Sequence, residues 1–275
     1  MYQKPAVPRS IGGVLDDTLQ LYKAAFSSCW LPALLTALVS GAFSYFIVAP
    51  LTTGLPQSNS LLVVLQRYEN LGPAYNIWNI VVSLVTLFLY GIIIINTAVV
   101  ARGATPAFGT SFSQVLRRFP AMVGASILFG LAVGAGAILL LIPGLYVWNR
   151  LQLYLVPLIV ERDGPAVSLA TSWRLVSGNW WRTLTIVMVL FVILFVLETV
   201  LLTLTGGLGT LFGPRPRGTA QTIAAVSLAT IAVGSLVRII TAPLICAVGV
   251  SLYHDLLLRK GGGDLEARLG ALPKA

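Results

Sequence analysis

The chain has 275 residues, of which 57% are hydrophobic and only 10% charged, with a net charge of +9. Soluble domains carry about 25% charged residues and disordered chains carry more, so both classes are excluded, as are collagen-like and disulfide-rich proteins (26 glycines, two cysteines). The composition predicts an all-α integral membrane protein.

Apolar stretches of the length that spans a bilayer as a helix, about 20 residues, recur six times. The fourth stretch is short and contains Arg150, the last is overlong and interrupted at Pro243, and Pro143 and Gly144 form a tight turn between the third and fourth. The sequence thus predicts a single polytopic membrane domain over residues 1–275. Its six predicted transmembrane helices cover residues about 29–51, 77–101, 120–142, 144–160, 183–205 and 221–253.

Three further segments, at about 10–27, 110–120 and 165–181, are amphipathic, with apolar residues at helical spacing and charges on another face. Each precedes a span that leads from the inside to the outside. They are expected to lie along the cytoplasmic interface with the apolar face in lipid, or to pack on the protein's own cytoplasmic ends. An interfacial helix, a span out and a span back would then occur three times, as a pseudo-threefold repeat.

The distribution of basic residues predicts the orientation. With the N-terminus inside, 13 of the 18 lysines and arginines fall in inner segments and only Arg67, Arg215 and Arg217 in outer loops. Cytoplasmic loops are enriched in basic residues, so both termini are predicted to be cytoplasmic. The same pattern explains the positive charge without a nucleic-acid partner, and none is expected.

The two long outer loops differ in character. Residues 52–76 are polar at both ends with an apolar centre, LLVVL at 61–65, which predicts a short helix on the outer interface or a re-entrant piece. Residues 206–220 are rich in glycine and proline and are expected to be a flexible loop.

Three ionisable residues fall within predicted spans: Arg150, Glu198 and Arg238. Arg150 and Glu198 lie at similar depth in the outer half, so an ion pair between them is predicted. Charges inside a bilayer are costly and often mark an ion or substrate path, but a structural pair and an arginine bonded to carbonyls would also account for them. Gly130 and Gly134 form a GxxxG motif, expected to pack against a neighbouring span or, less simply, against a second copy.

No catalytic, cofactor or metal-binding motif occurs in the sequence: no Walker loop, HExxH, CxxC or nucleophile elbow. The single histidine is followed by an aspartate at the end of the last span, and we interpret the two as interfacial residues. No enzyme activity and no cofactor are therefore expected. The interfacial candidates are Trp173, Arg174, Trp180, Trp181, His254 and Asp255.

The block LIPGLYVWNRLQLYLVPLIVERDGPAVSLATSWRLVSGNWWRT at 141–183 combines a Pro-Gly turn, a proline near the end of a short span, an acidic turn with glycine at 161–164, and a Ser-x-x-Leu helix at 172–175. With SIGGVLDDTLQLYKAAF and SLYHDLLLRKGGGDLEARL near the two ends, it resembles the YciC-like inner-membrane proteins and the membrane domain fused to some glycerophosphodiester phosphodiesterases. The resemblance implies a six-span fold in a bacterial plasma membrane. It implies no phosphodiesterase activity, because the catalytic part of the fused proteins is a separate soluble barrel.

Three functions remain open from the sequence. The first is a non-catalytic membrane-organising or accessory protein that engages membrane lipids, or a membrane or cytoplasmic protein partner, through its interfacial helices. The second is a small transporter or channel with a polar path near Arg150, Glu198 and Arg238. The third is a lipid-modifying enzyme with a His254–Asp255 site.

Overall fold

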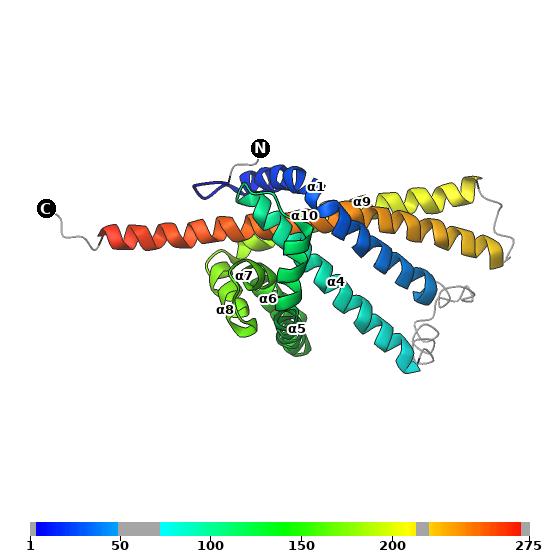
Figure 1. The fold of residues 1–275 in the computed structure, drawn as a ribbon, viewed down its shortest axis with the longest axis horizontal. Coiled ribbons are helices and arrows are strands. Elements are labelled where there is room, and N and C mark those ends of the chain that lie inside the picture. The colour runs from blue at the N-terminus through cyan, green and yellow to red at the C-terminus, as the bar shows by residue number, and fades with distance from the viewer. Residues whose placement is uncertain (1–3, 49–71, 213–219, 271–275) are drawn as a thin grey trace. The chain divides into compact units, whose positions relative to one another are not determined.

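The computed structural model describes residues 4–48, 72–212 and 220–270, and these contain helices and no strands (Figure 1). This confirms the prediction of an all-α protein. In chain order the elements are α1 (Ile11–Phe43), the π-helical η1 (Ser44–Val48), α4 (Gly72–Ala101), α5 (Phe108–Leu139), α6 (Leu141–Leu151), α7 (Leu155–Val160), α8 (Pro165–Val176), α9 (Trp180–Phe212) and α10 (Ala220–Gly270).

Five segments within the described ranges are, by length and composition, candidates to cross a membrane. They are Ile11–Phe46, Tyr75–Ala101, Phe108–Ile138, Trp180–Leu201 and Ile231–Gly261. Of the six predicted spans, the fourth, at 144–160, is missing from this set.

The fourth predicted span consists of two short helices instead of one. α6 ends at Leu151 and α7 begins at Leu155. Proline has no N–H group, so in a continuous helix Pro157 would leave the carbonyl of Leu153 without its partner. The interruption places Pro157 in the first turn of α7, where a backbone N–H has no helical partner in any case.

Two predicted boundaries between an interfacial helix and a span are wrong, because α1 and α5 run without interruption through both segments. The boundary expected near residue 28 is absent although Pro32 cannot donate to the carbonyl of Ser28. The amide of Asn96 donates to that carbonyl instead, at 2.8 Å. The oxygen of the same amide accepts from Ser111 at 2.6 Å, so the buried Asn96 is satisfied at both ends.

α10 likewise continues through Pro243, so the interruption predicted there is wrong. In lipid a single lost helical bond is tolerated more readily than a longer unpaired stretch of backbone. The third predicted interfacial helix does end before its span. α8 and α9 are separated at Gly178, whose φ of +84° is readily adopted only by glycine.

α5 and α6 form the predicted helical hairpin, but it turns at Leu140, whose backbone is extended, rather than at 142–144. The helices touch at Gly136 and Gly144, since a Cβ added to Gly136 would lie 3.1 Å from the Cα of Gly144. A Cβ added to Gly130 or Gly134 would meet nothing within 4 Å. The glycines that pack within the hairpin are thus Gly136 and Gly144, and the expected packing of the GxxxG motif against a neighbouring span stays a prediction.

The chain divides into two compact units: unit 1 contains residues 1–30, 90–191 and 242–275, and unit 2 contains residues 31–89 and 192–241. The core of unit 1 is formed by fully buried side chains from α1, α4, α5, α7 and α10. They include Leu21, Ile92, Met122, Leu158 and Tyr253. In unit 2, α1 and α10 approach so closely that a Cβ on Gly41 would collide with the hydroxyl of Ser235.

Part of the predicted outer loops falls outside the described residues, including the apolar segment at 61–65. The parts of these predicted loops that the structure does describe are helical. α9 continues to Phe212, through the first half of the loop expected at 206–220, and α4 begins at Gly72, five residues before the predicted span.

Candidate functional site

A buried carboxylate, that of Asp255 on α10, joins three distant parts of unit 1. Asp255 is 5% exposed. Its oxygens accept hydrogen bonds from Nη2 and Nε of Arg182 on α9, at 2.9 and 3.2 Å, and from Nε of Arg259 at 3.0 Å. They also accept the backbone N–H of Arg9 at 2.9 Å. One side chain thus ties the N-terminal segment to the start of α9 and the last part of α10.

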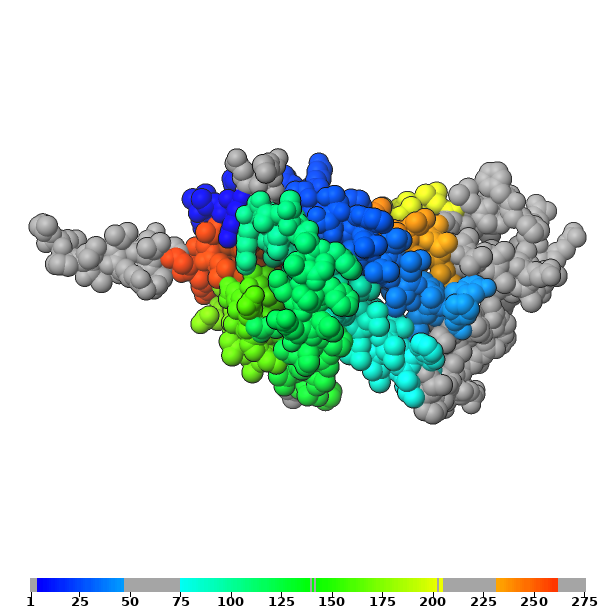
Figure 2. Space-filling view, in the orientation of Figure 1, coloured from blue at the N-terminus to red at the C-terminus, as the bar shows by residue number. Residues whose placement is uncertain are grey.

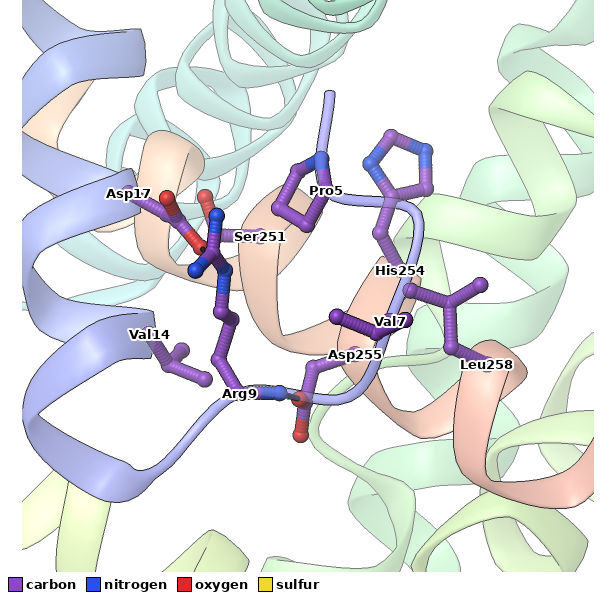
Figure 3. Close-up of a pocket in the computed structure, with 9 residues that line it drawn as sticks. All are labelled: Pro5, Val7, Arg9, Val14, Asp17, Ser251, His254, Asp255 and Leu258. Carbon is purple, nitrogen blue, oxygen red and sulfur yellow. Dashed lines mark hydrogen bonds and ion pairs between the residues drawn. The ribbon is translucent and has the colours of Figure 1, made fainter. Parts of the chain in front are cut away.

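The backbone of Arg9 is held from both sides. Its carbonyl accepts hydrogen bonds from Nη2 of Arg182 and from Nη2 of Arg259, each at 2.6 Å. We call residues 4–9 the N-terminal strap, and Figure 3 shows it crossing beside α10. The side chain of Arg9 points toward Asp17 of α1, with Nε 3.5 Å from a carboxylate oxygen (Figure 3).

We call Arg9, Asp17, Arg182, Asp255 and Arg259 the Asp255 cluster. Two local features position it. Asp255 and Arg259 are four residues apart on α10 and so share one face, with the acid on the N-terminal side as the helix favours. Ser10 accepts the N–H of Gly13 at 3.1 Å and caps the start of α1, which fixes the strap relative to that helix.

A cavity of about 10 Å³ lies between the strap and α10, lined in part by Ser251 and His254 (Figure 3). That volume is enough for about one water molecule and does not admit a substrate. His254 is 8% exposed. The hydroxyl of Ser251 and Nδ1 of His254 have no hydrogen-bond partner among the described protein atoms. The sequence placed His254 and Asp255 at the interface; the structure surrounds both with protein, and the geometry favours a structural role.

Arg150, on α6, makes its contacts within unit 1. Its guanidinium lies over the rings of Tyr146 and Trp173, 4.7 and 4.4 Å from their centres, as in a cation–π interaction. Its carbonyl accepts the hydroxyl of Ser172 at 2.8 Å. Glu198 is exposed on the part of α9 that belongs to unit 2, so its predicted pair with Arg150 joins the units and stays a prediction.

The remaining sequence candidates divide between exposed and packed positions. Arg238, on α10 in unit 2, and Arg174, on α8, are exposed. Trp173 and Trp181 are exposed by 39% and 76%. Trp180 is partly covered and lies edge-on to Trp181, with ring centres 4.6 Å apart.

Sequence reasoning identified Asp255 but none of its partners. Arg9, Arg182 and Arg259 entered only as members of the inner positive charge, and Asp17 was not singled out. The i, i+4 spacing of Asp255 and Arg259 is the one local signal that could have pointed to the cluster. Among the described residues, no group of three or more His, Cys, Asp or Glu side chains could hold a metal ion.

Comparison with known proteins identifies a family. A family model described as a domain of unknown function (DUF7847) matches residues 79–256. No curated protein and no solved structure matches the sequence. The matched segment includes Arg182 and Asp255, while Arg9, Asp17 and Arg259 lie outside it.

Proposed function

The chain belongs to the DUF7847 family, whose description assigns no activity, and we therefore propose a function from the chain's own residues. We propose a non-catalytic, multi-pass protein of the bacterial inner membrane. It engages lipid, or a membrane or cytoplasmic protein partner, through one face of unit 1. The resemblance to YciC-like proteins supports the bacterial inner membrane as its location.

The observation that carries this proposal is the pairing of exposed apolar side chains with arginines on α5 and α8. At the start of α5, Phe112 and Leu116 are 41% and 54% exposed, and the exposed Arg117 follows. On α8, Val167 and Trp173 are 55% and 39% exposed, and Arg174 follows. Apolar faces flanked by cations are typical of segments at the membrane–water boundary, where the chains insert and the cations meet headgroups.

Hydrogen bonds within unit 1 support an even number of crossings. The Asp255 cluster brings the N-terminal strap together with Arg259 near the end of α10. Tyr253 of α10 donates to Glu161 at the end of α7. These contacts support an arrangement in which the start of α1 and the ends of α7 and α10 lie on one side of a bilayer.

We propose six crossings, with α6 and α7 together serving as the fourth, and both termini in the cytoplasm, where basic loops are retained. The pseudo-threefold arrangement is part of the same proposal. An outward crossing follows each of three segments: the start of α1, the start of α5, and α8.

Mild extraction followed by mass spectrometry of the lipids and proteins that remain bound tests the function. We expect the wild type to retain lipid or one protein partner in stoichiometric amounts. The double variant Leu116→Ser/Val167→Ser should retain clearly less, because it removes apolar contact from both helices. Val7→Ser is the matched control, since Val7 is exposed by 60% on the strap. A wild type that retains neither lipid nor protein would refute the proposal.

Cysteine labelling in intact cells tests the orientation. Single cysteines at positions 57 and 215 should react with an impermeant reagent from outside, and those at 110 and 260 only after permeabilisation. The native Cys29 and Cys246 are 0% and 4% exposed, so they should give little background. The reverse labelling pattern would overturn the proposed topology.

A further inference from the structure

A pocket at the start of α5 is lined by three arginines. Its volume is about 280 Å³, and Arg117, Arg118 and Arg162 line it together with Gln114, over apolar side chains that include Ile159. Among the described residues that line it there is no carboxylate. Figure 2 shows the surface of α5, in green, beside the yellow-green surface of the segments that follow, which supply Arg162. The pocket belongs entirely to unit 1.

The acids nearest in sequence to Arg162 are already engaged elsewhere. Glu161 accepts a hydrogen bond from the hydroxyl of Tyr253, and Asp163 accepts one from the hydroxyl of Thr171 at 3.2 Å. The arginines of the pocket take part in none of the ion pairs found in the described part of the chain. No carboxylate of the described residues therefore forms an ion pair with these three arginines.

The backbone holds this turn in an uncommon conformation. Arg162 has a φ of +64°, and it is the only non-glycine residue of the described chain with positive φ. Such a conformation is strained for a side chain with a Cβ and persists where surrounding contacts impose it. Nη1 of Arg118 donates to the carbonyl of Arg162 at 2.7 Å and so links the backbone of this turn to α5 at the edge of the pocket.

The position of the pocket along α5 suits a headgroup. Phe112 and Leu116, five residues and one residue before Arg117, are exposed apolar residues, and the candidate span of α5 starts at Phe108. Basic pockets between membrane helices on the cytoplasmic side bind the headgroups of anionic phospholipids. The guanidinium group is the side chain best shaped for two parallel hydrogen bonds to a phosphate.

We propose that the pocket bounded by Arg117, Arg118 and Arg162 binds a phosphate group, and that the headgroup of an anionic phospholipid supplies it. The inference rests on the proposed function and deepens it, because it names the class of lipid and the residues that hold it. Arg118 orders the turn through the carbonyl of Arg162, while Arg117 and Arg162 remain available for the phosphate.

The test measures lipid binding by the full chain in nanodiscs that contain a neutral phospholipid and a titrated fraction of phosphatidylglycerol. The variant is Arg117→Gln/Arg162→Gln, which leaves the contact between Arg118 and the turn in place. Each cation near a membrane surface changes affinity for anionic lipid by about fivefold, so about 25-fold weaker binding is expected. The matched control is Arg102→Gln/Lys260→Gln, which removes two exposed charges of unit 1 outside the pocket and should weaken binding clearly less.

Equal weakening in the two double variants would overturn the pocket, because diffuse charge would then explain the binding. Unchanged binding in the Arg117/Arg162 variant would overturn it as well. In both cases a wild type that still retains lipid after mild extraction leaves the proposed function standing, so the two failures are distinguishable.

Two further arms use the wild-type chain. Hydrogen exchange of peptides around residues 114–118 and 158–164 should slow in phosphatidylglycerol nanodiscs relative to neutral ones, a readout that does not depend on the variants folding. Inorganic phosphate, added at millimolar concentration in neutral nanodiscs, distinguishes the sources. Protection by free phosphate equal to that by the lipid would overturn the lipid assignment, and protection by neither would overturn the pocket itself.

Discussion

Replacing Asp255 with alanine should destabilise unit 1 more than any other single change in the Asp255 cluster. The substitution removes the acceptor for three guanidinium N–H groups and one backbone N–H. Breaking a buried ion pair from one side costs about 3–5 kcal/mol. The low end applies, because Arg182 and Arg259 keep their bonds to the carbonyl of Arg9 and their side chains are 16% and 29% exposed.

A loss of about 3 kcal/mol corresponds to a fall in Tm of about 6–12 °C for a chain of this size, measurable by thermal unfolding of the detergent-solubilised protein. Asp16→Ala is the matched control, since Asp16 is an exposed acid on α1 and a surface change of this kind stays within about 0.5 kcal/mol. A Tm for Asp255→Ala equal to that for Asp16→Ala would refute the argument that this carboxylate anchors the strap.

Three more predictions follow from contacts in unit 1. Arg9→Pro should lower the Tm by several degrees because it deletes a backbone donor to a buried carboxylate, whereas Arg9→Ala should change it little; similar effects of the two would contradict backbone anchoring. Gly144→Ala should cost about 1–3 kcal/mol by overpacking the hairpin, and Gly130→Ala, which meets open space, should be neutral in the same thermal assay. A double-mutant cycle of Arg150→Met with Trp173→Leu should give a coupling of about 1–2 kcal/mol, and a coupling near zero would mean that the cation–π contact contributes nothing.

The sequence was most informative where one physical effect dominates. Five of the six expected spans overlap described helices that are long and apolar enough to cross a membrane, because hydrocarbon imposes the same length requirement on every crossing. Helix ends were harder to predict, since they depend on what receives the freed backbone groups. Pro32 does not end α1 because Asn96, 64 residues further along, donates to the exposed carbonyl. Pro157 is accommodated by an actual break between α6 and α7.

The candidate site was less accessible to sequence reasoning for a related reason. The bond between Arg9 and Asp255 spans 246 residues, and no periodicity or local motif encodes a contact of that range. Arg162 was assigned only to the inner positive charge, although the acidic residues on either side of it were visible in the sequence. What could not be read was that these acids accept hydrogen bonds from Tyr253 and Thr171 and that neither forms an ion pair with Arg162 in the described part of the chain.

Asp255, Arg182 and Arg259 bind the N-terminal strap through its backbone, which bears on how the sequence can vary among homologous chains. They hold Arg9 by its amide and carbonyl, which every amino acid except proline can offer. Natural selection on this anchoring should therefore preserve the aspartate and the two arginines that reach it, and should constrain position 9 only through the contact of its side chain with Asp17. An alignment of homologous chains is therefore expected to vary more at position 9 than at the aspartate and the two arginines, although the backbone of this segment is firmly held.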